Sequence, residues 1–186
     1  MAKRVLVIVA NGYEDMETVV PVDVLTRADV EVTIAGLEKG PVKGAYGSTI
    51  VPDTTLDRID GLYDALVLPG GVDNAERLAA HPGVVKQVHA HNDAGKLVCA
   101  ICASPALVLA EAAGILDGRK ATGYPDFSNK LAAYGAVVTD QVVTVDGNII
   151  TGMGPGAALP FALAVAGYLV GAEIPDGMAQ RWRITY

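Results

Sequence analysis

The chain of 186 residues is poor in cysteine, in aromatic side chains and in charge. Two cysteines are too few to hold a disulfide scaffold of this size, so we expect reduced thiols and a cytoplasmic location. Aromatic residues make up 5% of the chain, which leaves few surfaces for stacking the bases of single-stranded nucleic acid. Charged residues make up 19% and the net charge is −7, which argues against a basic face for nucleic acid or anionic lipid.

A hydrophobic run long enough to cross a membrane is also missing. The run at residues 5–10 is shorter than the core of a signal peptide, and Asn11-Gly12 follows it in place of a small-residue cleavage site. Residues 147–172 carry no charge, but Gly-Pro-Gly at 154–156 interrupts them. The apolar part that remains is shorter than the roughly 20 residues that a bilayer requires. We therefore expect a buried helix there and no membrane partner.

Hydrophobic residues, by contrast, are abundant and make up 51% of the chain. This composition is the reverse of a disordered protein, and the length fits one domain, residues 1–186. Apolar runs predict buried strands at 4–10, 30–35, 63–68 and 96–101. Helices are predicted between and after them at 14–27, 82–92, 103–113 and 157–170.

This alternation of strands and helices predicts an α/β fold, a doubly wound and mostly parallel sheet sandwiched by helices. Two hairpins are expected outside the alternation, one at residues 40–52 and one around Asp146-Gly147. Ligands of such folds bind beyond the carboxyl ends of the strands. Chemistry is therefore expected in the loops after residues 10, 68 and 101, and in the loop at 152–156.

The junction after the fourth predicted strand has the pattern of a nucleophile elbow. The strand ends at Ile101, Cys102 occupies the turn, and a helix is expected to follow at once. Ala103 and Ser104 are small enough for a tight turn, and Pro105 suits the first turn of a helix. The helix dipole and free N–H groups would favour a thiolate at this position. Cys102 is therefore the candidate nucleophile, although many cysteines are simply small buried hydrophobic residues.

Cys99 and Cys102 also form a C-x-x-C sequence, so a redox disulfide is an alternative. If residues 99–101 are extended, the two Cα atoms lie about 10 Å apart. A disulfide requires less than about 7 Å. The spacing therefore predicts that Cys99 is a buried strand residue with a structural role.

A carboxylate is better placed than a histidine to assist Cys102. The three histidines lie on or beside the predicted helix at 82–92 and are expected to be solvated: His81, His89 and His91. Glu17 lies one turn into the first predicted helix, near its apolar face, where burial should raise its pKa. We hypothesise a neutral Glu17 carboxyl beside a Cys102 thiolate, able to act later as acid and base.

The third predicted strand ends in two glycines, Gly70 and Gly71. Their flexible backbone could bring N–H groups close to an oxyanion, together with the N–H of Ala103. On the sequence alone, a plain turn accounts for the two glycines equally well.

Together these residues resemble the ThiJ/PfpI superfamily, most closely its branch around the parkinsonism-associated protein deglycase and its bacterial homologues. The matching motifs run in order along the chain: EDMET at 14–18, LPGG at 68–71, AICASP at 100–105 and GPG at 154–156. The resemblance implies a flavodoxin-like fold and a homodimer. It implies Cys102 as the reactive, oxidation-prone cysteine and Glu17 as its carboxyl partner. Family members are reported as glyoxalases that need no glutathione, and as deglycases, chaperones and oxidative-stress sensors.

Three positions depart from the pattern of relatives. Tyr124-Pro125 stands where some relatives have His-Pro, and a tyrosine is a poor base near neutral pH. Ala103 stands where the protease-like branch has a histidine, so peptidase activity is not expected. Tyr46 aligns with an arginine that some relatives use near the site.

The sequence thus predicts a cysteine enzyme that acts on small reactive carbonyl compounds such as methylglyoxal, without a metal or an organic cofactor. Cys102 would form a hemithioacetal with the aldehyde, and Glu17 would move a proton between adjacent carbons. Five residues are expected to bind the oxyanion and the substrate: Gly70, Gly71, Ala103, Tyr124 and Pro155. The alternative is a stress sensor or redox-regulated chaperone in which Cys102 is oxidised to a sulfinate that Glu17 stabilises.

Overall fold

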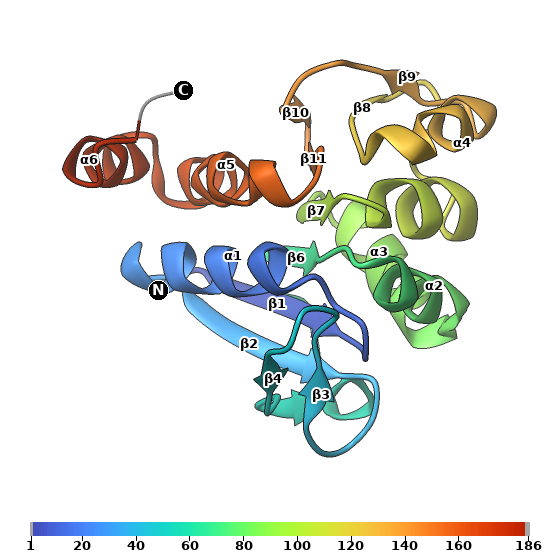
Figure 1. Cartoon of the computed structure of the whole chain (residues 1–186), viewed down its shortest axis with the longest axis horizontal. Helices are drawn as coiled ribbons and strands as arrows, with labels where there is room; N and C mark the ends of the chain where they lie inside the picture. The colour runs from blue at the N-terminus through green and yellow to red at the C-terminus, as the bar shows by residue number, and fades with distance from the viewer. Residues whose placement is uncertain (1, 185–186) are drawn as a thin grey trace.

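The computed structural model describes residues 2–184 and is centred on a seven-stranded sheet (Figure 1). The strand order is β10-β11-β7-β6-β1-β2-β5, and every adjacent pair is parallel except β10 with β11. The strands of this sheet are β1 (Arg4–Val9), β2 (Glu31–Gly36), β5 (Thr54–Thr55), β6 (Ala65–Leu68), β7 (Leu97–Ile101), β10 (Val143–Asp146) and β11 (Ile149–Gly152). The predicted mostly parallel sheet and the hairpin around Asp146-Gly147 are confirmed.

Helices cover both faces of this sheet. On one face α1 (Asp15–Arg27) packs against α5 (Ala158–Val170), which also contacts α6 (Glu173–Arg181). The other face carries α2 (Val72–Ala80), α3 (Pro82–Asp93), a π-helix at Pro105–Ala112 and α4 (Ser128–Ala133). Within residues 2–184, no helix has the length and apolar character needed to cross a bilayer.

The residues of β1 show why both faces must be covered. Val5, Val7 and Val9 belong to the core under α1 and α5, whereas Leu6 and Ile8 belong to the core on the other face. All five side chains are fully buried. A strand buried on both faces reads as a continuous apolar run, which is the pattern from which this strand was predicted.

Two small sheets lie beside the main one. β3 (Val42–Lys43) and β4 (Thr49–Ile50) form the hairpin expected at 40–52, and β8 (Lys120–Ala121) pairs with β9 (Val137–Val138). Short 3-10 turns occupy Leu56–Arg58, Pro125–Phe127 and Pro155–Ala157. Asp15 fixes the hairpin to the start of α1, because its carboxylate accepts hydrogen bonds from the amides of Tyr46 (2.9 Å) and Ser48 (2.8 Å).

The structure differs from the sequence-based expectation in the helices around the candidate site. Helices α2, α4 and α6 were not predicted. Helix α2 is hidden in the sequence because it begins directly after Gly71 and only His81 separates it from α3. The helix expected at 103–113 is a π-helix over Pro105–Ala112, and the Cys102 turn before it has a positive φ.

The prediction that all three histidines are solvated is wrong for His91, whose side chain is fully buried. Its Nε2 accepts a hydrogen bond from the amide of Tyr63 (3.1 Å), and its Nδ1 lies 2.8 Å from the carbonyl of Gln87. A ring that accepts at one nitrogen and donates at the other is a neutral imidazole. Burial lowers the pKa of His91, which favours the same neutral form. This histidine ties α3 to the segment that enters β6.

Candidate active site

Cys102 occupies a sharp turn at the carboxyl end of β7. Its φ of +65° lies in the left-handed region, which a residue with a side chain adopts at a cost of order 1–3 kcal/mol. Main-chain hydrogen bonds hold the turn on both sides. The amide of Cys102 donates to the carbonyl of Gly152 (3.0 Å), and its carbonyl accepts from the amide of Tyr124 (2.8 Å). A strand, a strained turn and a helix in succession are the geometry that a nucleophile elbow requires.

Glu17 extends from α1 toward this turn and is fully buried. Its Oε2 accepts a hydrogen bond from the amide of Gly70 (2.9 Å), and its own amide donates to the carboxylate of Glu14 (2.7 Å). Within residues 2–184, Oε1 has no hydrogen-bond partner. The polar neighbour of the carboxyl is the Cys102 thiol, with which it shares a hydrogen bond.

The environment of Glu17 favours a protonated carboxyl. Burial raises the pKa of Glu17 to about 8, and the negative charge of Glu14 adds to the rise. The hydrogen bonds with Cys102 and Gly70 lower this pKa but do not cancel the effect of burial. At pH 7 the Glu17 carboxyl is therefore mostly neutral, in agreement with the hypothesis made from its position in the sequence.

The thiol of Cys102 is also affected chiefly by its burial. Burial and the charge of an ionised Glu17 raise the pKa of Cys102 to about 12, whereas hydrogen bonds from the amides of Gly71 and Ala103 lower it. The sequence led us to expect a net effect in favour of thiolate, and this expectation is not met, because burial outweighs the two amides. The charge of Glu17 acts on the thiol only above a pH of about 8, where the carboxyl loses its proton.

The two glycines after β6 are required by close packing. A Cβ at Gly70 would overlap Oε2 of Glu17 and the Cβ of Cys102, and a Cβ at Gly71 would overlap the carbonyl of Gly12. Gly71 also has a φ of +82°, which favours glycine. A plain turn therefore does not account for the two glycines, since they let the backbone approach both Glu17 and Cys102.

Tyr124 and Pro155 line one mostly apolar cavity of about 350 Å³, whose lining includes neither Cys102 nor Glu17. The tyrosine follows the turn closely, through its amide bond to the Cys102 carbonyl, and its ring packs next to Gly154. Pro155 belongs to the loop that follows β11, the strand whose end holds the Cys102 amide. The structure thus brings together Cys102, Glu17, Gly70, Gly71 and Ala103, and places Tyr124 and Pro155 at the adjacent cavity.

Cys99 is placed as its spacing predicted. Its side chain is completely buried in the middle of β7, and both cysteines are free thiols. Burial raises the pKa of Cys99 well above its ordinary value. Cys99 is therefore an unreactive core residue, and the C-x-x-C sequence is not a disulfide here.

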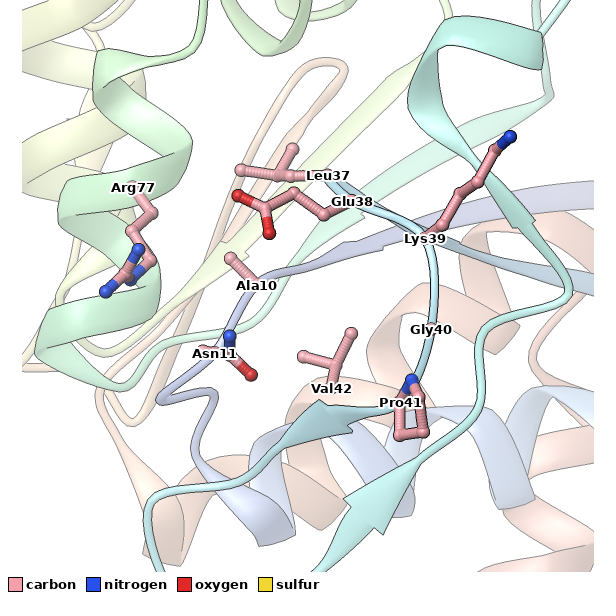
Figure 2. A pocket seen from close by; sticks show the side chains of 9 residues that line it. All are labelled: Ala10, Asn11, Leu37, Glu38, Lys39, Gly40, Pro41, Val42 and Arg77. Carbon is pink, nitrogen blue, oxygen red and sulfur yellow. The ribbon is translucent and has the colours of Figure 1, made fainter.

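Another cavity, of about 70 Å³, lies over the carboxyl ends of β1 and β2 and contains none of the predicted site residues. Figure 2 shows the Arg77 side chain of α2 on one side of it and Glu38 opposite, while the Lys39 side chain extends away. The floor includes Ala10 and Asn11, in the loop after β1. No group of three or more His, Cys, Asp and Glu residues is arranged to hold a metal ion in the part of the chain from 2 to 184.

Sequence reasoning missed Asn74 and Ser104, two buried polar residues beside the glycine loop. Ser104 donates to the carbonyl of Pro69 (2.5 Å), and Asn74 contacts the carbonyls of Pro69 and Gly70. Ser104 adjoins the elbow in sequence and was treated only as a small residue. Nothing in the sequence placed Asn74 near the site, because the helix that contains it was not predicted.

Comparisons with known proteins relate the chain to one family. The model of the DJ-1/PfpI family matches residues 3–167. A Parkinson disease protein 7 homolog of Danio rerio is 41% identical over 176 residues, which are 92% of each chain. A deglycase of Pyrococcus horikoshii is 35% identical over 153 residues, which are 82% of this chain and 90% of that protein.

A solved structure described as oxidized DJ-1 of Toxoplasma gondii has a TM-score of 0.93 with this chain at 34% sequence identity. The alignment covers 100% of both chains. This agreement along the whole length confirms the flavodoxin-like fold expected from the motifs.

The packing at Gly70 leads to a stability prediction. Gly70→Ala should lower the free energy of unfolding by about 1–3 kcal/mol, because the added methyl group forces Glu17 and Cys102 apart. Gly177→Ala is the matched control, since nothing lies within 4 Å of a Cβ at that helical position. Chemical denaturation measures both. Equal stability of Gly70→Ala and the unmodified protein would contradict the packing described here.

Proposed function

Because the chain belongs to the DJ-1/PfpI family, we propose that it is a cysteine-dependent enzyme of reactive carbonyl compounds, either a glutathione-independent glyoxalase or a deglycase like its archaeal relative. The observation that carries the proposal is the buried contact between the Cys102 thiol and the Glu17 carboxyl, beside two amides directed at the sulfur. A nucleophile, a proton carrier and oxyanion donors in one water-poor site are what addition to an aldehyde requires.

The first step forms a carbon–sulfur bond. Once the carboxyl of Glu17 has lost its proton, the Cys102 thiol can pass its own proton to the carboxylate, which leaves a thiolate. The thiolate adds to the aldehyde carbon of a 2-oxoaldehyde such as methylglyoxal. The amides of Gly71 and Ala103 meet the negative charge that develops on the aldehyde oxygen. That oxygen then takes the proton from Glu17, and the product is a neutral hemithioacetal.

The second step moves hydrogen between two carbons. The Glu17 carboxylate removes the proton from the former aldehyde carbon, which gives an enediolate, and the hydroxyl proton on that carbon passes to the ketone oxygen. Glu17 then returns its proton to the former ketone carbon. The aldehyde carbon is thereby oxidised to a thioester while the ketone carbon is reduced to an alcohol, so no external oxidant or reductant is consumed. Water hydrolyses the thioester, which releases lactate and regenerates the thiol.

Tyr124 and Pro155 are proposed to contact the part of the substrate that does not react. They line the apolar cavity beside the turn, and the hydroxyl of Tyr124 can donate a hydrogen bond where some relatives have a histidine. A tyrosine hydroxyl keeps its proton near neutral pH. Proton transfer is therefore assigned to Glu17 alone.

Replacing the nucleophile tests this mechanism. Cys102→Ser should abolish the formation of lactate from methylglyoxal, because a serine hydroxyl stays protonated and adds poorly to the aldehyde. Glu17→Gln should slow the reaction by about a hundredfold or more, since it removes the proton carrier. Cys99→Ala is the control and should retain activity. Comparable lactate formation by Cys102→Ser and the unmodified protein would rule the mechanism out.

The raised pKa of Glu17 predicts the pH dependence of turnover. Below a pH of about 8 both members of the Cys102–Glu17 pair carry a proton, and the reactive form with one proton is scarce. The value of kcat/KM should therefore rise about tenfold per pH unit between pH 5.5 and 7 and level off above pH 8. Initial rates of lactate formation across buffers of equal ionic strength measure it. A flat profile from pH 5.5 to 8 is incompatible with Glu17 as the titrating group.

A redox role of the same thiol is the second candidate, favoured by the buried Glu17 carboxyl beside the thiol and by its unpaired Oε1. The thiolate would react with two molecules of hydrogen peroxide to give a sulfinate and two molecules of water. A protonated Glu17 could donate a hydrogen bond to the sulfinate. The solved Toxoplasma gondii relative is itself described as oxidized.

Peroxide treatment separates the two roles. If the redox role is the main one, mild peroxide should add two oxygen atoms to Cys102 and none to Cys99, as seen by peptide mass measurement. The oxidised protein should then suppress aggregation of a denatured client, while lactate formation stays negligible. Suppression that is unchanged by oxidation, or by Cys102→Ser, would argue against a redox-regulated chaperone.

We also propose a homodimer, formed through the exposed apolar groove between α1 and α5. The groove has a volume of about 510 Å³, and its α1 side includes Met16 and Val19, which are 52% and 48% exposed. Its far side includes Leu159 and Pro155. An apolar patch of this kind on a folded protein marks a contact surface. A second copy seated there would also cover the loop that carries Pro155.

The dimer is tested by placing a charge in the groove. Val19→Glu should yield a monomer in light scattering coupled to size-exclusion chromatography, because it would bury an unpaired carboxylate in an apolar interface. Val51→Glu, at a 73% exposed position on the hairpin, is the control and should stay dimeric. A monomeric unmodified protein, or a dimeric Val19→Glu, would contradict the proposed interface.

A further inference from the structure

The loop between β6 and α2 contains two peptide groups that the proposed chemistry requires in one orientation. The amide of Gly70 donates to Glu17, and the amide of Gly71 donates to the Cys102 sulfur. Consecutive glycines, however, offer little steric resistance to rotation of the peptide between them. The orientation must therefore be imposed by contacts from outside the loop.

Asn74, in the first turn of α2, provides such contacts. Its side chain is fully buried, and Nδ2 donates to the carbonyls of Pro69 (2.9 Å) and Gly70 (3.1 Å). Its Oδ1 accepts a hydrogen bond from the amide of Ala10 (2.7 Å), at the end of β1. With two carbonyls on one side and an N–H group on the other, only one orientation of the amide satisfies all three partners.

Because the peptide bond is planar, the direction of each carbonyl fixes the direction of the N–H group that follows it. In a trans peptide the C=O and the following N–H point in opposite directions, and all peptide bonds of the described residues 2–184 are trans. Holding the Pro69 carbonyl toward Asn74 therefore directs the Gly70 amide away from Asn74, toward Oε2 of Glu17. Holding the Gly70 carbonyl in the same way directs the Gly71 amide toward the Cys102 sulfur.

We propose that Asn74 is a positioning residue that orients the Gly70 and Gly71 amides toward Glu17 and Cys102. As a role in catalysis, this inference rests on the proposed function, but its effect on the thiol does not depend on turnover. Other groups support single carbonyls: the Glu14 amide donates to Gly70 (3.1 Å), and the Ser104 hydroxyl donates to Pro69 (2.5 Å). Within residues 2–184, Asn74 is the side chain that donates to both.

The orientation also decides which oxygen of Glu17 carries the proton. The Gly70 amide occupies Oε2 as a donor, so Oε2 is held as an acceptor. Oε1 is the oxygen without such a partner, and the thiol is the polar group beside this carboxyl. The proton of the neutral carboxyl therefore resides on Oε1. Asn74 controls this arrangement without contacting either residue.

The test is the rate at which iodoacetamide alkylates Cys102, counted by peptide mass measurement between pH 7 and 10. Asn74→Asp keeps the size of the side chain and an acceptor for Ala10, but it replaces the donor to the two carbonyls by an oxygen. The alkylation rate should fall about tenfold at each pH, the equivalent of one pKa unit, because the thiolate loses the aligned Gly71 amide. Asn74→Ala, which lacks both functions, should show the same fall.

A matched control separates positioning from general stability. The Asn148 amide also donates to a main-chain carbonyl, that of Lys96 (3.0 Å), but at the opposite end of β7 from Cys102. Asn148→Ala should lower the melting temperature and leave the alkylation rate unchanged. If a folded Asn74→Asp alkylates as fast as the unmodified protein, or faster, the proposal is overturned. The same holds if Asn148→Ala slows alkylation equally.

Turnover provides a second readout. In Asn74→Asp, kcat for methylglyoxal should fall about tenfold while KM stays within twofold, because the apolar cavity for the substrate is untouched. If the unmodified protein forms no lactate, the proposed glyoxalase function fails, and the alkylation rates still decide the role of Asn74. Unchanged kcat in an active, folded Asn74→Asp protein would contradict a positioning role in catalysis.

Discussion

The Cys102 thiol and the Glu17 carboxyl are buried against each other, and the surrounding strands and loops hold the two groups in this contact. Neither group is easily ionised in such a place, since burial raises the pKa of both. Sharing a proton is the arrangement that lets one of them become reactive without placing two negative charges in the same small space. The amides of Gly71 and Ala103 lie beside the thiol and lower its pKa.

The fold produces this contact from segments far apart in the sequence. Cys102 comes from the end of β7, Glu17 from the helix after β1, and the glycine loop from the end of β6. These three strands are neighbours in the parallel sheet, so their carboxyl ends meet at one edge. The two cores on either face hold the strands in register. Hydrogen bonds with Gly152 and Tyr124 hold the strained turn at Cys102, and Asn74 holds the carbonyls of Pro69 and Gly70 in the glycine loop.

Local sequence patterns predicted the elements whose apolar runs or turn residues lie within a few positions of one another. The apolar run of β1, the strand before Cys102, the hairpin at Asp146-Gly147 and the final apolar helix were all predicted close to their observed bounds. Helix α2 was not predicted, because the glycines before it and Pro82 after it are residues typical of turns. The burial of His91 was missed for a different reason. A histidine on a helix becomes a core residue only when another segment, here Tyr63, supplies its partner.

The sequence is sufficient to predict the fold class, and it nominates Cys102 and Glu17 for the site, because these inferences depend on residue types in short, ordered motifs. It also determined that Cys99 could not bridge to Cys102, since an extended strand fixes their separation. The ionisation of the site and the orientation of its amides could not be predicted from the sequence. Both depend on burial and on hydrogen bonds between distant segments, and Asn74, 28 residues before Cys102 in the chain, has its effect through three such bonds.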